Sequence, residues 1–260
     1  MRSEQIWIGL LGTLKVTYTS EVIRHRSLQI TAAKQRQVLA MLAANANTTV
    51  STDQLIDELW SSDPPSTVKT IVHTYVYQLR KLFGERLRSA NGATLLATRP
   101  GGYLLTVPPE NVDIFRFQEL MGRGRAALRH GRPDHAAELL GQSLALWRGS
   151  ILPDVDMGPV LKGLSVYLEE QRLEAVSARI DADLANNRHG ELVGELRRLV
   201  ASHRLHEPFH IRLMQALHRS GRRGEALGAY HQLRTILNQD LGLEPSGEAR
   251  QMQCEILNSD

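Results

Sequence analysis

Between Ser66 and Phe83 the sequence places hydrogen-bond donors on one face of a predicted helix. The apolar residues of this stretch recur in steps of three and one, the period with which a helix buries a single stripe. The opposite face contains neither Asp nor Glu, whereas an ordinary solvated helix face mixes charges of both signs. At about 100° per residue, this face is centred on Ser66, Thr70, His73, Tyr77 and Arg80, and it is flanked by Lys69, Lys81 and Thr74.

Side chains of these types can donate hydrogen bonds to phosphates and to base edges in a DNA major groove, which is about as wide as one helix. We expect Lys69, Arg80 and Lys81 to contact phosphates, because they flank or end the face. The candidates for base contact are Thr70, His73, Thr74 and Tyr77, and Tyr77 could touch a thymine methyl group. The alternatives are a merely basic surface helix and, for each residue, a solvated side chain without a role.

Two helices and two groups of strands must position this face. The first thirty residues predict strands at 6–11 and 14–18 and an edge hairpin at 22–30. A helix is predicted at 33–46, and a second begins at Ser51, where Gln54 completes a capping box. After the third helix, strands at 94–98 and 103–107 flank a turn at 99–102. Three helices followed by a hairpin indicate a winged helix-turn-helix, and the N-terminal sheet indicates its OmpR-type variant.

Three further cations of this part of the chain could meet DNA. Lys34 and Arg36 begin the first helix, whose positive N-terminus would help them to grip phosphates. Arg99 lies in the hairpin turn, or wing, and could enter the adjacent minor groove. The charge of the chain agrees with this assignment, because residues 1–106 carry a net +5 and the remainder −2. A chance scatter of charges is the alternative.

Pro108-Pro109 predicts a domain boundary, with a DNA-binding domain at 1–107 and an almost purely helical domain at 108–260. Residues 131–137 and 221–227 are faintly similar, and Ala226 followed by Tyr230 fits a tetratricopeptide-like repeat. A plain helical bundle is the alternative. The fold class is therefore mainly α with a small β component. The predicted helices of the second domain are 112–130, 134–147, 160–186, 190–203, 207–219, 223–239 and 246–257.

Other features of the sequence exclude several classes of protein. No run approaches the roughly 20 apolar residues of a membrane-spanning helix, and no signal peptide is recognisable, so we expect a soluble, cytoplasmic protein. Cys254 is the single cysteine and is expected to pack within the last helix. His203, His206 and His210 have helix-like offsets, but Pro208 interrupts them and no metal site is expected. No cofactor motif and no acid, base or nucleophile constellation is visible, so we expect no enzyme.

The chain resembles the Streptomyces antibiotic regulatory protein (SARP) family of transcriptional activators from Leu11 to Leu257. In the first domain the resemblance rests on residues 34–40, 50–60, 75–82 and 101–103. In the second it rests on LALWRG at 144–149, which resembles the signature of the bacterial transcriptional activation domain, and on 213–222 and 241–245. ATPase, sensor and receiver modules of larger regulators are expected to be absent.

The resemblance implies an activator that binds direct repeats overlapping a promoter −35 region and recruits RNA polymerase holoenzyme, usually for antibiotic biosynthesis genes. The expected partners are double-stranded DNA, the polymerase and a second copy of the chain, as a homodimer or a tandem pair on DNA. In OmpR-type activators the loop before the recognition helix faces polymerase, which makes Ser62, Asp63 and Pro64 candidate contacts; a simple turn is the alternative. The competing function is a helical-repeat interaction scaffold whose basic first domain is no specific DNA reader.

Overall fold

The computed structural model describes residues 5–19, 26–60, 63–86 and 95–259. The chain forms two compact units, one made of Met1–Met121 with Gln142–Arg172, the other of Gly122–Gly141 with Leu173–Asp260. Three helices contribute residues to both units, namely α4 (Asp113–Arg129), α5 (Pro133–Leu144) and α6 (Pro159–Ala185). The first unit therefore contains the N-terminal elements together with parts of the helical half.

The first unit begins with an antiparallel sheet of β1 (Gln5–Gly9), β2 (Lys15–Thr19) and β3 (Arg26–Leu28), in that order. Ile8 faces Val16 in the β1–β2 register, and both side chains are buried. Two of the predicted strands are thus present with slightly shifted ends. Of the predicted hairpin at 22–30, residues 22–25 lie outside the described residues, and β3 falls in the remainder.

Three helices follow, α1 (Ala33–Ala44), α2 (Thr52–Trp60) and α3 (Val68–Arg86), and each packs against the other two. Helix α1 ends two residues earlier than predicted, before Asn47 takes a left-handed conformation with φ 65°. The predicted capping box begins α2: the N–H of Ser51 donates to Oε1 of Gln54 at 2.9 Å, and the N–H of Gln54 donates to Oγ of Ser51 at 3.1 Å.

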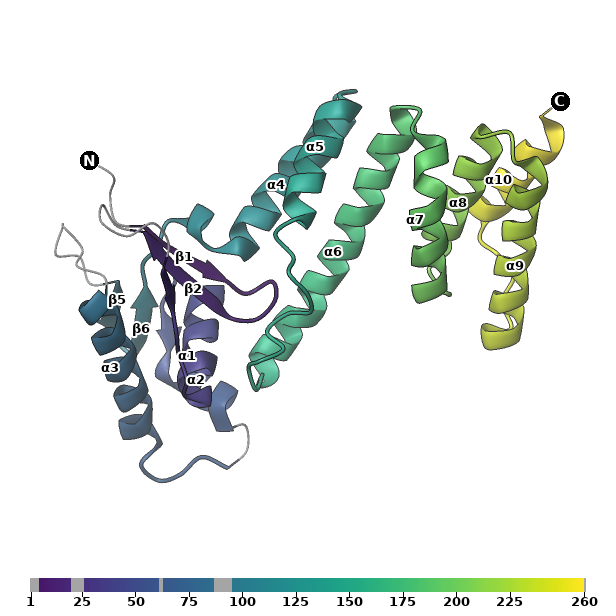
Figure 1. Ribbon diagram of the computed structural model, residues 1–260. Coiled ribbons are helices and arrows are strands. Elements are labelled where there is room, and N and C mark those ends of the chain that lie inside the picture. Colours follow the sequence, from purple (N-terminus) through teal and green to yellow (C-terminus); the bar gives the residue numbers. More distant parts are fainter. Residues whose placement is uncertain (1–4, 20–25, 61–62, 87–94, 260) are drawn as a thin grey trace. The chain divides into compact units, whose positions relative to one another are not determined.

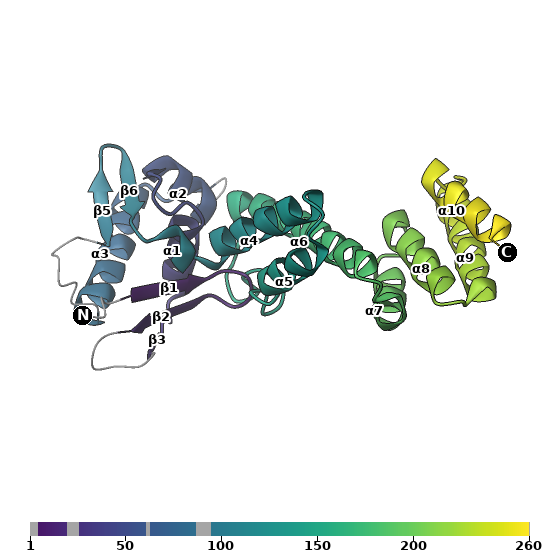
Figure 2. The ribbon, with the colours of Figure 1, turned by 90° about the horizontal axis from the view of Figure 1, so that it is seen from above.

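A second antiparallel sheet has the order β4–β6–β5, from β4 (Val50–Ser51), β6 (Gly102–Leu105) and β5 (Leu96–Arg99). Figures 1 and 2 show β5 and β6 beside α3. Strand β4 was not predicted, because two residues are too few to display an alternating pattern. It passes so close to β6 that a Cβ at Gly102 would lie 2.1 Å from the carbonyl oxygen of Val50. These elements form a winged helix-turn-helix.

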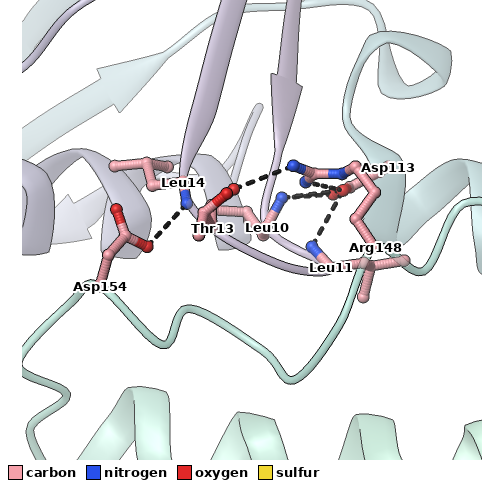
Figure 3. Close-up of polar contacts among 7 residues, drawn as sticks. All are labelled: Leu10, Leu11, Thr13, Leu14, Asp113, Arg148 and Asp154. Carbon is pink, nitrogen blue, oxygen red and sulfur yellow. Dashed lines mark hydrogen bonds and ion pairs between the residues drawn. The ribbon is translucent and has the colours of Figure 1, made fainter.

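Residues from the start of the helical half pack into the same unit after a short 3-10 helix, η1 (Pro109–Asn111). The buried carboxylate of Asp113 accepts hydrogen bonds from the N–H groups of Leu10 and Leu11, at 2.7 and 2.9 Å, and from Nη2 of Arg148 at 3.1 Å (Figure 3). Asp154 accepts from the N–H of Leu14 at 2.9 Å. The turn between β1 and β2 is therefore held by residues more than 100 positions away.

The second unit is helical and has a continuous apolar core. Its remaining helices are α7 (His189–Ser202), α8 (Glu207–Arg219), α9 (Arg223–Leu241) and α10 (Gly247–Asn258). Neighbouring helices α7, α8 and α9 pack in succession, and α10 packs on α8 and α9. Ala226 and Tyr230 are both buried, as a tetratricopeptide-like repeat requires. The predicted helices of this half agree with the observed ones to within about three residues.

One side chain of the second unit differs from the prediction made for it. Cys254 is exposed on α10, so the prediction that it is packed was wrong; the buried face of α10 contains Ala249 and Ile256 instead. His210 is fully buried on α8.

Within the described ranges, no three His, Cys, Asp or Glu side chains gather where they could hold a metal ion. None of the helices formed by the described residues is both long and apolar enough to cross a membrane.

Candidate nucleic-acid interface

Helix α3 presents the predicted polar face to solvent. Its apolar stripe is buried through Val72, Val76, Leu79 and Phe83. On the other side Arg80 is half-buried, and Tyr77 keeps 65% of its surface exposed although its ring is large. The remaining predicted residues are all exposed: Ser66, Lys69, Thr70, His73, Thr74 and Lys81. The position of the face was therefore predictable from helical period alone.

One exposed polar residue of this face was missed. Gln78 lies beside Thr74, at the edge of the apolar stripe, and its Oε1 accepts a hydrogen bond from Nε2 of Gln35 on α1 at 2.6 Å. The hydroxyl of Thr74 donates to the carbonyl oxygen of Thr70 at 2.9 Å, which fixes its rotamer along the helix. An amide side chain at the edge of a polar face is of the kind that reads adenine. The residue type could therefore have identified Gln78 as a candidate base contact.

His73 contacts the wing, which consists of β5, β6 and the turn between them. Its Nδ1 lies 2.9 Å from the hydroxyl of Tyr103 on β6, and the two rings meet edge to face with centroids 5.8 Å apart. Tyr103 is 1% exposed. Burial raises the pKa of Tyr103, an effect that the nearby Arg80 cation opposes. The phenol therefore keeps its proton near neutral pH. Sequence reasoning missed Tyr103 as a site residue, although a buried tyrosine hydroxyl needs a partner.

Arg80 connects α3 to the other strand of the wing. Its Nε donates to the carbonyl oxygen of Leu96 at 2.8 Å, and its Nη2 donates to Oγ1 of Thr98 at 2.8 Å. Strand β5 lies at the edge of its sheet, so its backbone has no neighbouring strand on this side. The guanidinium supplies hydrogen-bond donors there instead. The structure gives Arg80 a role in docking the wing, and its predicted phosphate contact stays a prediction.

The tip of the wing carries an exposed cation. Arg99 ends β5, and Gly101 follows in the turn with φ 78°, a conformation that favours glycine. The carbonyl oxygen of Gly101 accepts a hydrogen bond from the N–H of Thr52 at 2.9 Å, so the turn is tied to the start of α2. In the described part of the chain, the side chains of Arg99 and Lys69 have no ion-pair or hydrogen-bond partner.

Lys34 and Arg36 are engaged by the protein itself. Nζ of Lys34 donates to the carbonyl oxygen of Leu59 at 2.6 Å and to Gln37, and it lies 4.0 Å from the carboxylate of Asp156. Nε of Arg36 donates to the carbonyl oxygen of Asp154 at 3.2 Å, and its Nη1 donates to Thr31. A phosphate would have to compete with these partners for Lys34 and Arg36, and their predicted phosphate contacts stay a prediction.

The loop before α3 is only partly described. Ser62 lies outside the described residues, while Asp63 and Pro64 are exposed. The N–H of Asp63 donates to the carbonyl oxygen of Trp60, the last residue of α2, at 3.3 Å. Exposure makes Asp63 and Pro64 accessible to a partner, and the polymerase contact stays a prediction.

The comparisons with known proteins identify both parts of the chain. Residues 26–105 match the family "Transcriptional regulatory protein, C terminal", and residues 112–257 match the "Bacterial transcriptional activator domain". Regulatory protein DnrI of Streptomyces peucetius is 40% identical over 97% of this chain and 92% of its own length. Transcriptional regulator RedD of Streptomyces coelicolor is 36% identical over 97% of this chain and 71% of its own length.

A solved structure is also similar to this chain. Mycobacterium tuberculosis EmbR, determined in complex with a low-affinity phosphopeptide, gives a TM-score of 0.90 at 34% identity. The match covers 98% of this chain and 65% of that of EmbR. By their printed names, DnrI is a regulatory protein, and RedD and EmbR are transcriptional regulators. With both family matches and the extended similarity to DnrI, the chain belongs to the Streptomyces antibiotic regulatory protein family of transcriptional regulators.

Proposed function

We propose that this protein is a sequence-specific DNA-binding transcriptional activator that binds direct repeats near a promoter −35 region and recruits RNA polymerase. The genes it controls are those of a secondary-metabolite, antibiotic-type biosynthetic cluster. The single observation that carries the proposal is the exposed face of α3, on which the described residues from Ser66 to Lys81 include no Asp or Glu, next to a wing whose strand β5 ends in Arg99. Such a pairing fits a helix in the major groove and a cation in the neighbouring minor groove.

The exposed residues divide by the kind of contact that they fit. Lys69 and Arg99 have no partner among the described residues, so phosphate or groove contacts would not cost them an existing ion pair. Thr70, Thr74 and Tyr77 lie on the centre and rim of the exposed face and fit base contacts. Ser66 and Lys81 lie near its two ends and fit backbone contacts.

The remaining predicted residues take a second rank in the proposal. Arg80 and His73 contact the wing and would meet DNA with the donors that those contacts leave. Lys34 and Arg36 would contribute to phosphate binding through their long-range charge, because their side chains already serve acceptors of the protein.

The partners follow from the same arrangement. Two copies of the chain on direct repeats would bind head to tail, about one helical turn apart, rather than about a two-fold axis. In the proposed division of labour, residues 1–107 read DNA, and residues 108–260 form the activation domain. Asp63 and Pro64 in the loop before α3 are the proposed contact with polymerase holoenzyme, and their exposure supports this.

The first test selects genomic fragments with the purified chain at about 50 and 200 mM salt, since phosphate contacts weaken steeply over this range. We expect a few promoter fragments that share a direct repeat and remain bound at the higher salt. Inverting one repeat of such a fragment should abolish the second binding step. Binding that is sequence-blind and lost at the higher salt would contradict the proposal and favour an interaction scaffold.

The second test measures the salt dependence of affinity for a selected fragment. Lys69→Ala and Arg99→Ala should each reduce the slope of log K against log salt by about one unit. Arg250→Ala is the matched control, because Arg250 is an exposed arginine on α10. Equal slopes for all four proteins would refute the assignment of these two cations.

The third test measures run-off transcription with polymerase holoenzyme on the same fragment. Asp63→Ala and Pro64→Ala should lower transcript yield while the affinity for DNA stays that of the parent. Unchanged yield in both variants would remove this loop from the proposed polymerase contact, and a parallel loss of affinity would assign it to DNA binding instead.

A further inference from the structure

We propose that Tyr103 is a positioning residue that fixes the ring of His73 so that Nε2–H faces DNA as a donor that selects guanine. The proposal rests on the DNA-binding function proposed above and names one base contact within it. His73 stands on the exposed face of α3, and Tyr103 lies beneath it on β6. The contact between them therefore joins α3, the proposed recognition helix, to the wing.

The direction of the hydrogen bond follows from what surrounds the tyrosine. In the part of the chain that the structure describes, Nδ1 of His73 is the single hydrogen-bond partner of the Tyr103 hydroxyl. If Nδ1 carried the proton and donated it, the hydroxyl proton would be left without an acceptor in a buried place, which native proteins avoid. The hydroxyl therefore donates, Nδ1 accepts, and the imidazole proton resides on Nε2.

This tautomer determines what the histidine can recognise. The Nε2–H group requires an acceptor, and in the major groove guanine offers two adjacent acceptors, N7 and O6. Adenine places an amino donor next to its N7, which opposes an N–H group, and cytosine presents an amino donor. A His73 with this tautomer thus favours guanine over adenine and cytosine. It also favours guanine over thymine, which offers the single acceptor O4 beside its methyl group. Phosphate oxygens are also acceptors, but a phosphate contact would not discriminate between bases.

Several contacts fix the wing relative to α3, so Tyr103 can hold the His73 ring in a defined position. Arg80 ties α3 to β5 through Leu96 and Thr98, each at 2.8 Å. Strand β6 pairs with β5 on one side and with β4 on the other. The aromatic ring of Tyr103 is packed in the core, so Tyr103→Phe removes the hydroxyl and keeps the packing. His73 would then lose the partner that fixes its ring about χ2.

The first experiment uses the full chain and measures affinity for an operator and all its single-base variants. His73→Ala and Tyr103→Phe should relax preference at the same guanine, by about fivefold for His73→Ala, the loss of one net hydrogen bond, and by less for Tyr103→Phe. Tyr18→Phe is the matched control, since it removes a hydroxyl from another buried tyrosine of the same unit. In the His73→Ala background, Tyr103→Phe should have no further effect on preference, because it acts through the histidine.

A purely structural role for Tyr103 would instead lower affinity for every variant equally, and would do so in the His73→Ala background as well. A uniform loss for His73→Ala would assign the histidine to a phosphate. Either result would overturn the proposal.

The second experiment does not require DNA. Nitrogen-15 spectra of histidine-labelled protein at about pH 8 report which imidazole nitrogen carries the proton, with His73 assigned by its loss in His73→Ala. We expect a protonated Nε2, and an Nδ1 resonance that moves in Tyr103→Phe and stays in Tyr18→Phe. A protonated Nδ1 would overturn the proposal. If the parent selects no operator, the proposed function fails, and this measurement still decides how Tyr103 holds His73.

Discussion

The carboxylate of Glu58 on α2 accepts a hydrogen bond from the N–H of Gly158, just before the first turn of α6, at 2.6 Å. The same carboxylate accepts hydrogen bonds from the N–H groups of Val160 and Leu161, at 2.9 and 3.1 Å. A Cβ at Gly158 would lie 2.0 Å from the carbonyl oxygen of Glu58, so the two backbones meet where only glycine fits. The helix-turn-helix thus caps the helix that follows it by about a hundred residues.

Glu58→Ala should destabilise the protein by about 3 kcal/mol, because it leaves several backbone N–H groups without an acceptor in a buried place. The measurement is the urea midpoint of unfolding. Asp57→Ala is the matched control, since its side chain precedes Glu58 on the same helix and is exposed; it should shift stability by less than about 0.5 kcal/mol. Equal midpoints for the two variants would show that the cap contributes nothing.

Arg148→Ala should make stability fall more steeply as pH rises. Burial raises the pKa of Asp113 above the usual value of an aspartate, while the hydrogen bonds from Leu10 and Leu11 and the Arg148 cation oppose the rise. Removing Arg148 raises the folded-state pKa further, so the folded protein binds more protons than the unfolded chain above pH 4. Because the unfolded chain then releases protons, stability declines with increasing pH.

This prediction is tested by urea unfolding at about pH 4.5 and 7. The stability difference between the parent and Arg148→Ala should widen at the higher pH, whereas the difference for Arg250→Ala should stay constant. A difference that is equal at both pH values would mean that Arg148 does not act on Asp113 through its charge.

Much of the fold was predictable from local pattern. Helices α8 and α9 begin as predicted because charged or proline residues interrupt the apolar period there, and the Ser51–Gln54 capping box marks the start of α2. The face of α3 followed from the same period. These features depend on residues within a few positions of each other, which a single sequence displays.

The partners of the site residues could not be predicted in this way. Tyr103 and Leu96 reach α3 from 30 and 16 positions away, and neither spacing has a period. The inward engagement of Lys34 depends on Leu59, at the far end of another helix. A cation at a helix N-terminus looks the same in sequence whether it faces a phosphate or a carbonyl oxygen of its own protein.

Gly102→Ala should weaken DNA binding for all sequences, because a Cβ at this position would push β6 away from Val50 and displace the wing. The expected result is a lower affinity for every operator variant, together with a weaker preference at the guanine that His73 selects, because β6 carries Tyr103. The control is Gly122→Ala on α4, where a Cβ meets nothing within 4 Å. If both variants bound DNA as the parent does, the wing would have no part in the interface. The measurement is a titration of a selected operator at fixed salt, with circular dichroism to verify folding.

The buried His210 should make the protein less stable in mild acid. Burial lowers the pKa of His210 from 6.5, against the opposing effects of the Arg204 carbonyl and Glu207. Its Nε2 lies 2.9 Å from that carbonyl oxygen, so Nε2 donates, while Nδ1 is buried with no partner among the described residues. The ring is therefore neutral in the folded protein. Below pH 6.5 the unfolded chain takes up a proton that the folded chain refuses, and stability is lost as pH falls.

The test compares unfolding free energies of the parent and His210→Gln between pH 7.5 and 5. Gln retains a donor for the Arg204 carbonyl and does not titrate, so the advantage of the parent should shrink on acidification by up to about 1.4 kcal/mol per pH unit. Gln232→Ala, which changes an exposed residue of α9 that does not titrate, should give a curve parallel to the parent. A parallel curve for His210→Gln as well would mean that His210 takes up its proton equally in both states, which its burial without a second hydrogen-bond partner argues against.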